Sequence, residues 1–164
     1  MASIIGVETL QHTNGTTAAT IDSSGRITKP ANPAFFANVS AEISSDGVLV
    51  FNTVRLNNGS HYSGTTGLFT APVDGIYMFA MGTLLKTPNT TSYGRLRIRI
   101  NGVTQSAYTV HSSYNSTRNY EPLSWSGCLE LDANDTVGVY FDGANSAATY
   151  GGSGYTYFNG HLIG

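Results

Sequence analysis

Few residues of this chain have the types and spacing that catalysis needs. Nucleophilic catalysis requires a nucleophile, a base and an orienting group that meet in space. The four histidines, His12, His61, His111 and His161, are scattered along the 164 residues, and none lies in a known catalytic motif. A nucleophile elbow, a phosphate-binding loop and a His-Glu-x-x-His pair are also missing from the sequence. We therefore expect no catalytic residues and no enzymatic activity.

An alternating run of arginines is the clearest charged motif. Arg95, Arg97 and Arg99 alternate with aliphatic residues between positions 95 and 100. In a β-strand this spacing places three guanidinium groups on one face. Like charges in such a row repel one another unless an anion lies near. The row is either a solvated face whose arginines pair with Asp or Glu across the sheet, or an anion site or a belt of ion pairs between subunits.

Cys128 is the only cysteine, so an intrachain disulfide is excluded. It lies in an apolar stretch between Trp125 and Leu129. We interpret it as a small buried hydrophobe rather than a reactive thiol.

The composition limits the function classes. Only 11% of the residues are charged, the net charge is −2 and 40% of the residues are hydrophobic. This balance argues against a nucleic-acid partner. The sequence has no apolar run of about 18 residues, so we expect no membrane span. The first residues lack a basic region followed by an apolar one, so we expect no signal peptide.

From residue 34 onward the pattern predicts an all-β domain. Short apolar or alternating segments are separated by turn residues, and Asn101-Gly102 is the strongest hairpin signal. Phe35, Ala37 and Val39 share one face of the first strand. The expected strands are 34–41, 48–51, 67–72, 76–81, 95–100, 105–111, 123–131, 136–141 and 155–163. Strands of this length and spacing are typical of a sandwich or jelly roll.

Residues 76–81 are apolar on both faces of the expected strand. Tyr77, Phe79 and Met81 can fill the sandwich core. Ile76, Met78 and Ala80 then need a second cover, which is either a symmetric subunit interface or a loop of the same chain.

Late in the chain, Tyr155 and Tyr157 also share one face. They pack in the core or at an interface, or they form an adaptable contact surface for a glycan or a protein. The loops 86–94 and 111–120 are the best candidates for outward recognition.

Residues 1–33 are polar and small, and we separate them from a head at 34–164. A short strand is expected at Thr17–Ile21. This segment is either a disordered terminus or an arm that adds strands to a partner. The residues that would attach the arm are its apolar ones: Ile4, Ile5, Val7, Leu10, Ile21 and Ile27.

Three motifs follow one another along the head. They are Thr66-Gly67-x-Phe69-Thr70-x-Pro72-x-x-Gly75-x-Tyr77-x-Phe79, then Leu129-x-Leu131, and at the end Phe158-x-Gly160-x-Leu162-Ile163. Through them residues 34–163 resemble the globular complement 1q domain, a tumour-necrosis-factor-like jelly roll. The resemblance implies a ten-stranded jelly roll and a tight homotrimer. The implied trimer agrees with the two apolar faces of residues 76–81, and we expect Ile76, Met78, Ala80, Tyr155 and Tyr157 to form its interface.

Several complement 1q-like heads carry calcium, and calcium needs six to eight oxygen ligands. The carboxylates of Glu130, Asp132, Asp135 and Asp142 could supply some of these ligands or could be ordinary turn acids. The sequence has no defined calcium loop, so we assign no metal and no cofactor.

Residues 7–28 are similar to the openings of structural proteins of tailed phages. The two resemblances together imply a non-enzymatic trimeric virion protein, made in the host cytoplasm and carried on the particle surface. Its partners would be its own copies, capsid or tail proteins and a host surface glycan or protein. A capsid decoration protein is the first expectation. A tail or head fibre knob that binds a host receptor and a soluble complement 1q-like binding module are the alternatives.

Overall fold

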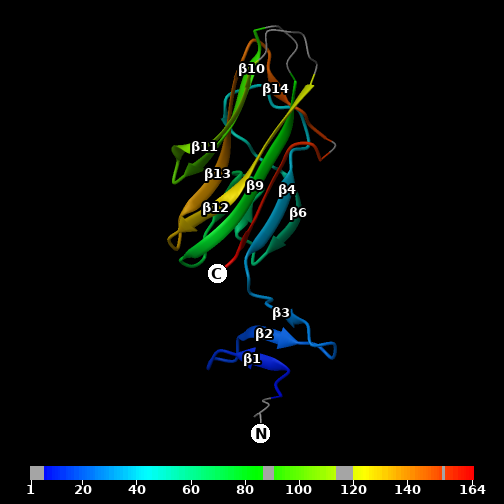
Figure 1. The fold of residues 1–164 in the computed structure, drawn as a ribbon, viewed down its shortest axis with the longest axis vertical. Helices are drawn as coiled ribbons and strands as arrows, with labels where there is room; N and C mark the ends of the chain where they lie inside the picture. Colours follow the sequence, from blue (N-terminus) through cyan, green and yellow to red (C-terminus); the bar gives the residue numbers. More distant parts are fainter. Residues whose placement is uncertain (1–5, 87–90, 114–119, 153) are drawn as a thin grey trace. The chain divides into compact units, whose positions relative to one another are not determined.

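The computed structural model describes residues 6–86, 91–113, 120–152 and 154–164 (Figure 1). The chain divides into two compact units, Met1–Asn32 and Pro33–Gly164. All regular secondary structure in the described residues is β-strand, so the all-β prediction is confirmed. Within those residues, no helix has the length and apolar character to cross a membrane.

The first unit is a small antiparallel sheet in the order β1-β2-β3. Its strands are β1 (Thr9–Gln11), β2 (Thr17–Ile21) and β3 (Ile27–Thr28). The strand expected at Thr17–Ile21 is confirmed, whereas its two partners were not predicted. Ala19 is the only buried hydrophobic side chain in the described part of this unit.

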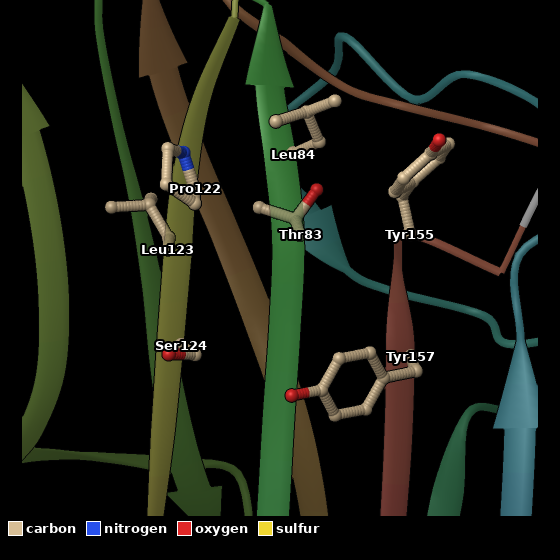
Figure 2. Close-up of a pocket in the computed structure, with 7 residues that line it drawn as sticks. All are labelled: Thr83, Leu84, Pro122, Leu123, Ser124, Tyr155 and Tyr157. Carbon is tan, nitrogen blue, oxygen red and sulfur yellow. The ribbon is translucent and has the colours of Figure 1, made fainter.

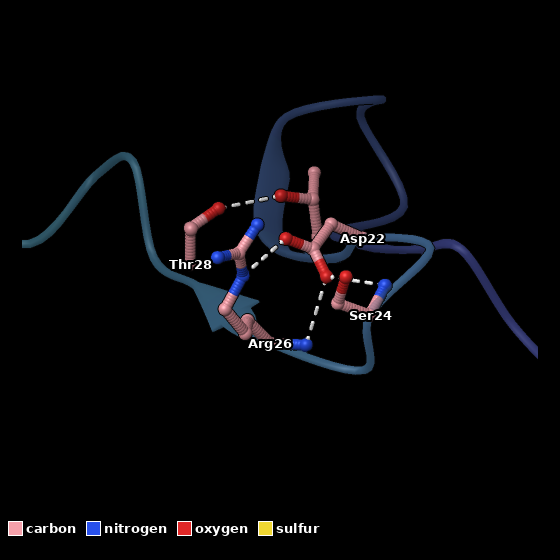
Figure 3. Close-up of polar contacts among 5 residues, drawn as sticks. Asp22, Ser24, Arg26 and Thr28 are labelled. Carbon is pink, nitrogen blue, oxygen red and sulfur yellow. Dashed lines mark hydrogen bonds and ion pairs between the residues drawn. The ribbon is translucent and has the colours of Figure 1, made fainter.

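The turn between β2 and β3 is held by one carboxylate (Figure 3). Asp22 accepts hydrogen bonds from the backbone N–H groups of Ser24 at 2.8 Å and Arg26 at 3.0 Å. It also pairs with Nε of Arg26 at 2.7 Å. Beyond the turn, the hydroxyl groups of Thr20 and Thr28 lie 2.6 Å apart across the two strands. Side-chain hydrogen bonds to the backbone of this kind stabilise turns in place of a buried core.

The second unit, the head, is a sandwich of two antiparallel sheets. The β9 sheet has the order β12-β9-β15-β4-β6, with β14 also paired to β9. Its strands are β4 (Ala34–Asn38), β6 (Thr53–Asn58), β9 (Gly75–Lys86), β12 (Tyr120–Leu131), β14 (Ala148–Thr149) and β15 (Tyr157–Leu162). In Figure 1 the C-terminal strand β15 runs between the green β9 and the blue β4.

The β10 sheet has the order β11-β10-β13-β8-β7, with β5 also paired to β13. Its strands are β5 (Gly47–Val48), β7 (Tyr62–Ser63), β8 (Leu68–Thr70), β10 (Tyr93–Ile100), β11 (Val103–Ser113) and β13 (Thr136–Ala144). Each sheet has six strands, so the head has twelve strands in its described residues where ten were expected. Three of the twelve, β5, β7 and β14, have only two residues.

Stacked and edge-on aromatic rings fill the space between the sheets. Phe79 lies 5.5 Å from Phe69, 5.8 Å from Phe158 and 6.3 Å from both Phe35 and Tyr77, between ring centroids. All five side chains are at most 2% exposed. The predicted core face of residues 77, 79 and 81 is therefore confirmed.

Phe79 fits this core because a glycine stands opposite it on the neighbouring strand β15. Gly160 of β15 and Gly127 of β12 are its direct partners across the sheet. A Cβ atom on Gly160 would lie 2.4 Å from Cδ1 of Phe79. The glycine of the Phe158-x-Gly160 motif thus leaves the space that the ring occupies.

The hairpin between β10 and β11 turns at Asn101-Gly102 as predicted. Both residues have positive φ, 51° and 77°, as two-residue hairpin turns of this sequence require. Arg99 pairs with Thr104, but the register then shifts, and Arg97 pairs with Thr109. The extra residues of β11 form a bulge beside the arginine row.

The prediction for residues 48–51 was wrong in detail. Strand β5 ends at Val48, although Leu49 and Phe51 beyond it are fully buried. One more backbone hydrogen bond to β13 follows, from the N–H of Leu49 to the carbonyl of Val139 at 2.8 Å, and the chain then leaves this sheet to form β6 on the other. Strand β6 itself was not predicted.

Candidate functional site

The outer surface of the β9 sheet exposes apolar side chains from four adjacent strands. We call Phe36, Leu56, Ile76, Met78, Ala80 and Tyr157 the apolar face. Ile76 is 48% and Leu56 is 52% exposed, and the other four are half-buried. The described residues of the head place no loop over Ile76. Among the described residues, Ile76 therefore lacks the loop cover that was the alternative to a subunit interface.

A shallow pocket of about 210 Å³ opens beside the apolar face, between β9, β12 and the start of β15 (Figure 2). Thr83 and Leu84, Pro122 to Ser124, and the two tyrosines 155 and 157 line it. Figure 2 shows the hydroxyl of Tyr157 directed toward β9. The ring lies over Gly82, where a Cβ atom would be 2.7 Å from its Cε1. Tyr155 stands at the rim and is 54% exposed.

The structure therefore brings together four of the five residues assigned to the trimer interface. Ile76, Met78, Ala80 and Tyr157 share one surface, and Tyr155 lies just before β15 at its edge. An exposed apolar surface that spans several strands is typical of a protein-binding face.

Cys128 also lies on this surface, which corrects its interpretation as a buried residue. It is exposed, and its Sγ lies 3.9 Å from Sδ of Met78 on the adjacent strand. The reason is the alternation of β12, in which Leu129 and Leu131 point into the core and Cys128 points outward.

The arginine row lies on the outer face of the other sheet. Leu96 and Ile98 are buried in the core, so Arg95, Arg97 and Arg99 point away from it. Asp142 of β13 pairs with two of them. Its Oδ1 lies 2.7 Å from Nε of Arg95, and its Oδ2 lies 2.7 Å from Nη2 of Arg97. The hydrogen bond to Asp142 raises the pKa of the Arg95 guanidinium above its ordinary value.

Arg99 is held differently from its two neighbours. Its guanidinium carbon lies 4.7 Å from the ring centroid of Tyr140. Its Nε is buried and finds no hydrogen-bond partner among the described residues. The pairing interpretation thus applies to Arg95 and Arg97, whereas Arg99 forms no ion pair within the described part of the chain.

The carboxylates singled out in the sequence do not converge. Asp142 faces the arginines, whereas Asp135 accepts hydrogen bonds from Asn101 at 2.6 Å and from the backbone N–H of Asp132 at 3.0 Å. The Asn101 hydrogen bond, with that of Asp132, lowers the pKa of Asp135. No group of three His, Cys, Asp or Glu side chains in the described residues could hold a metal ion.

The arm residues are mostly exposed in their own unit. Val7, Leu10 and Ile27 are 40%, 51% and 64% exposed, and Ile21 is half-buried. Leu10 pairs with Ala19 and Ile21 with Ile27, so these four share one face of the small sheet. Ile4 and Ile5 lie outside the described residues, as do positions 87–90 and 114–119 of the two candidate recognition loops.

The sequence profile of the C1q domain matches residues 34–163. The chain belongs to the C1q domain family. The match covers the whole sandwich from β4 to β15, and it agrees with the resemblance read from the motifs at 66–79 and 158–163.

Solved structures show the same fold. The globular domain of zebrafish complement 1qA is 24% identical, with a TM-score of 0.55 over 81% of this chain and 98% of that one. Murine APRIL in crystals at pH 5.0 is 14% identical, with a TM-score of 0.61 over 80% of this chain and 99% of that one. At pH 8.5 it gives a TM-score of 0.60 at 15% identity. The likeness at these identities establishes the fold of this C1q domain.

Some site residues were missed from the sequence. Phe36 could have been found, because alternation with Phe35 and Ala37 places it on the outer surface. Leu56 lies on the unpredicted strand β6. Asp142 could not have been assigned to Arg95 and Arg97, because the pairing of β10 with β13 leaves no local signal in the sequence.

Proposed function

We propose that this C1q domain protein is a homotrimeric, non-enzymatic binding module whose apolar face is the subunit interface. The observation that carries the proposal is the surface of Ile76, Met78, Ala80 and Tyr157. Four neighbouring strands contribute to this face, and one side of an antiparallel sheet normally becomes polar when it faces water. Closed symmetry is the usual way in which copies of one chain cover such a surface.

The pocket beside the apolar face supports a specific fit between copies. It exposes Leu84, Pro122 and the edges of two tyrosine rings, which are groups that gain from burial against another protein. Tyr155 is the most exposed of these rings and becomes an anchor in the proposed interface.

We further propose that the trimer is a structural protein on the surface of a tailed-phage particle, most simply a capsid decoration protein. The similarity of residues 7–28 to the openings of such proteins supports this role. The arm sheet offers an apolar face of Leu10, Ile21 and Ile27 but buries almost nothing by itself. A small sheet with so little core gains stability when a partner covers it.

The first test is the native mass of the full chain in solution, measured by multi-angle light scattering. The proposal expects three times the chain mass of 17.4 kDa. A stable species of 17.4 kDa at micromolar concentration would refute the trimer.

The second test is the copy number of the chain per purified virion, measured by quantitative mass spectrometry against the major capsid protein. Hundreds of copies support a decoration protein. A few copies in multiples of three would indicate a fibre or tail knob that binds a host receptor. A virion without the chain would refute the particle role and favour a soluble binding module.

A further inference from the structure

A groove of about 320 Å³ runs along the outer face of the β10 sheet, away from the apolar face. Arg95 and Arg97 of β10 line one side, and Thr104, Ser106 and Thr109 of β11 line the other. Every lining side chain therefore carries an N–H or O–H group that can donate a hydrogen bond. The bulge in β11 widens this side of the hairpin and brings Thr109 opposite Arg97.

Positive charge is in excess on this face. Asp142 is the only carboxylate in the sequence of β10, β11 and β13, against three arginines. Asp142 engages one nitrogen of Arg95 and one of Arg97. A guanidinium has five N–H donors, so both arginines keep donors for another anion.

The contacts within the described part of the head do not satisfy the Arg99 side chain. Its Nε is buried without a hydrogen-bond partner in the described part of the chain, and its guanidinium lies over Tyr140 instead of beside a carboxylate. A buried N–H without a partner lowers stability. The residue extends the row of positive charge by one more position along β10.

We propose that this groove and the arginine row bind an acidic polysaccharide, a chain of sugars that carry carboxylate or sulfate groups. Successive arginines on one strand face stand about 7 Å apart, so they suit a ligand with repeated negative charges. Arginine forks match the planar geometry of carboxylates, and the threonine and serine hydroxyls can bond to sugar hydroxyls. The proposal goes beyond the trimer and the particle, since it concerns the other sheet of a single chain.

A nucleic acid fits the same face less well. Proteins that bind single strands stack bases on free aromatic rings. The two rings beside the row, Tyr93 and Tyr140, already lie under Arg95 at 5.1 Å and Arg99 at 4.7 Å. The net charge of −2 is also unfavourable for a long polyphosphate.

The test is isothermal titration calorimetry of the full chain with polygalacturonate, which carries carboxylates, and with dextran sulfate. Neutral dextran is the control polymer. The proposal expects binding to at least one acidic polymer, none to dextran, and weaker binding as NaCl rises from about 0.05 M to about 0.3 M and screens the charges. Absence of binding to both acidic polymers, or an equal affinity for single-stranded DNA, would overturn it.

Two variants locate the binding on this face. Arg97→Gln and Arg99→Gln should each weaken binding about fivefold, the effect of losing one exposed ion pair. Arg26→Gln in the arm and Arg55→Gln on the β9 sheet make the same charge change elsewhere and should leave binding within about twofold. Arg99 forms no ion pair with the described residues, so its variant loses the contact with the Tyr140 ring but no salt bridge and should remain folded. A folded Arg99→Gln protein that binds like Arg26→Gln would overturn the assignment.

Discussion

Replacement of Gly160 by alanine tests how rigidly the core is packed. The added Cβ would lie 2.4 Å from Cδ1 and 2.7 Å from Cε1 of Phe79, and 3.0 Å from the carbonyl oxygen of Met78. Phe79 cannot move away freely, because it touches the rings of Phe35, Phe69 and Phe158. Overpacking of this kind costs about 1–3 kcal/mol, and the crowding places Gly160→Ala near the upper end.

The assay is thermal unfolding followed by circular dichroism, at one fixed protein concentration because association also shifts the midpoint. For a chain of this length a loss of about 2–3 kcal/mol lowers the melting temperature by roughly 4–12 °C. Gly127→Ala is the matched control, since it also faces Phe79 but its Cβ would meet the half-buried Trp125, which can shift. Its effect should be smaller than that of Gly160→Ala.

A double variant separates the ring contact from other effects. Phe79→Leu shortens the side chain that opposes Gly160, so Gly160→Ala should destabilise a Phe79→Leu background less than the parent. If Gly160→Ala melts within about 2 °C of the parent, the core yields to the added methyl group and the reasoning is refuted.

Three further perturbations address the interface, the acid sensitivity and the arm. Met78→Asp would bury an unpaired charge in every chain of the proposed trimer, at about 3–5 kcal/mol each, so light scattering should report monomers; Met78→Leu should remain trimeric. The hydrogen bond from Asn101 holds the pKa of Asp135 below its usual 3.8. That contribution to stability is therefore complete above the unfolded-state pKa and is lost as the pH falls through the lower folded-state pKa. Asp135→Asn should flatten the acid side of the stability profile in urea titrations, and an unchanged profile would contradict this role. Deletion of residues 1–29 should leave the head folded and trimeric, because β4–β15 lie within the second unit. The same deletion should abolish attachment to particles. A truncated head that still binds particles would refute the arm as the anchor.

Local pattern made the arginine row and the strand at 76–81 predictable from the sequence. In the arginine row, side chains two positions apart share a chemical type and the type changes with every residue, whereas at 76–81 an unbroken apolar run makes both faces of the strand apolar. The same rule applied to Leu129 would have placed Cys128 on the outer surface. Ser124, Ser126 and Glu130 mark the outward positions of this segment, but counting Cys128 among its apolar residues hid the alternation.

Register and pairing between distant strands were not predictable. A regular hairpin about Asn101-Gly102 would pair Arg97 with Ser106, but the shift in β11 pairs it with Thr109. The choice depends on how β11 packs, since Tyr108 in the bulge lies 5.3 Å from Trp125 of the other sheet, between ring centroids. Contacts of that kind leave no trace in the local sequence of either strand.

The pairing of β4 with β15 places a constraint on how the protein is made. Ala34 lies opposite His161, so the first and the last strand of the head are neighbours in the middle of one sheet. Most of the domain must be synthesised before this pair can close, and such distant pairings slow folding. Until then the strands that carry Met78 and Phe36 lack β15 between them. A growing chain therefore cannot present a complete apolar face before β15 has been synthesised and has paired with β9 and β4.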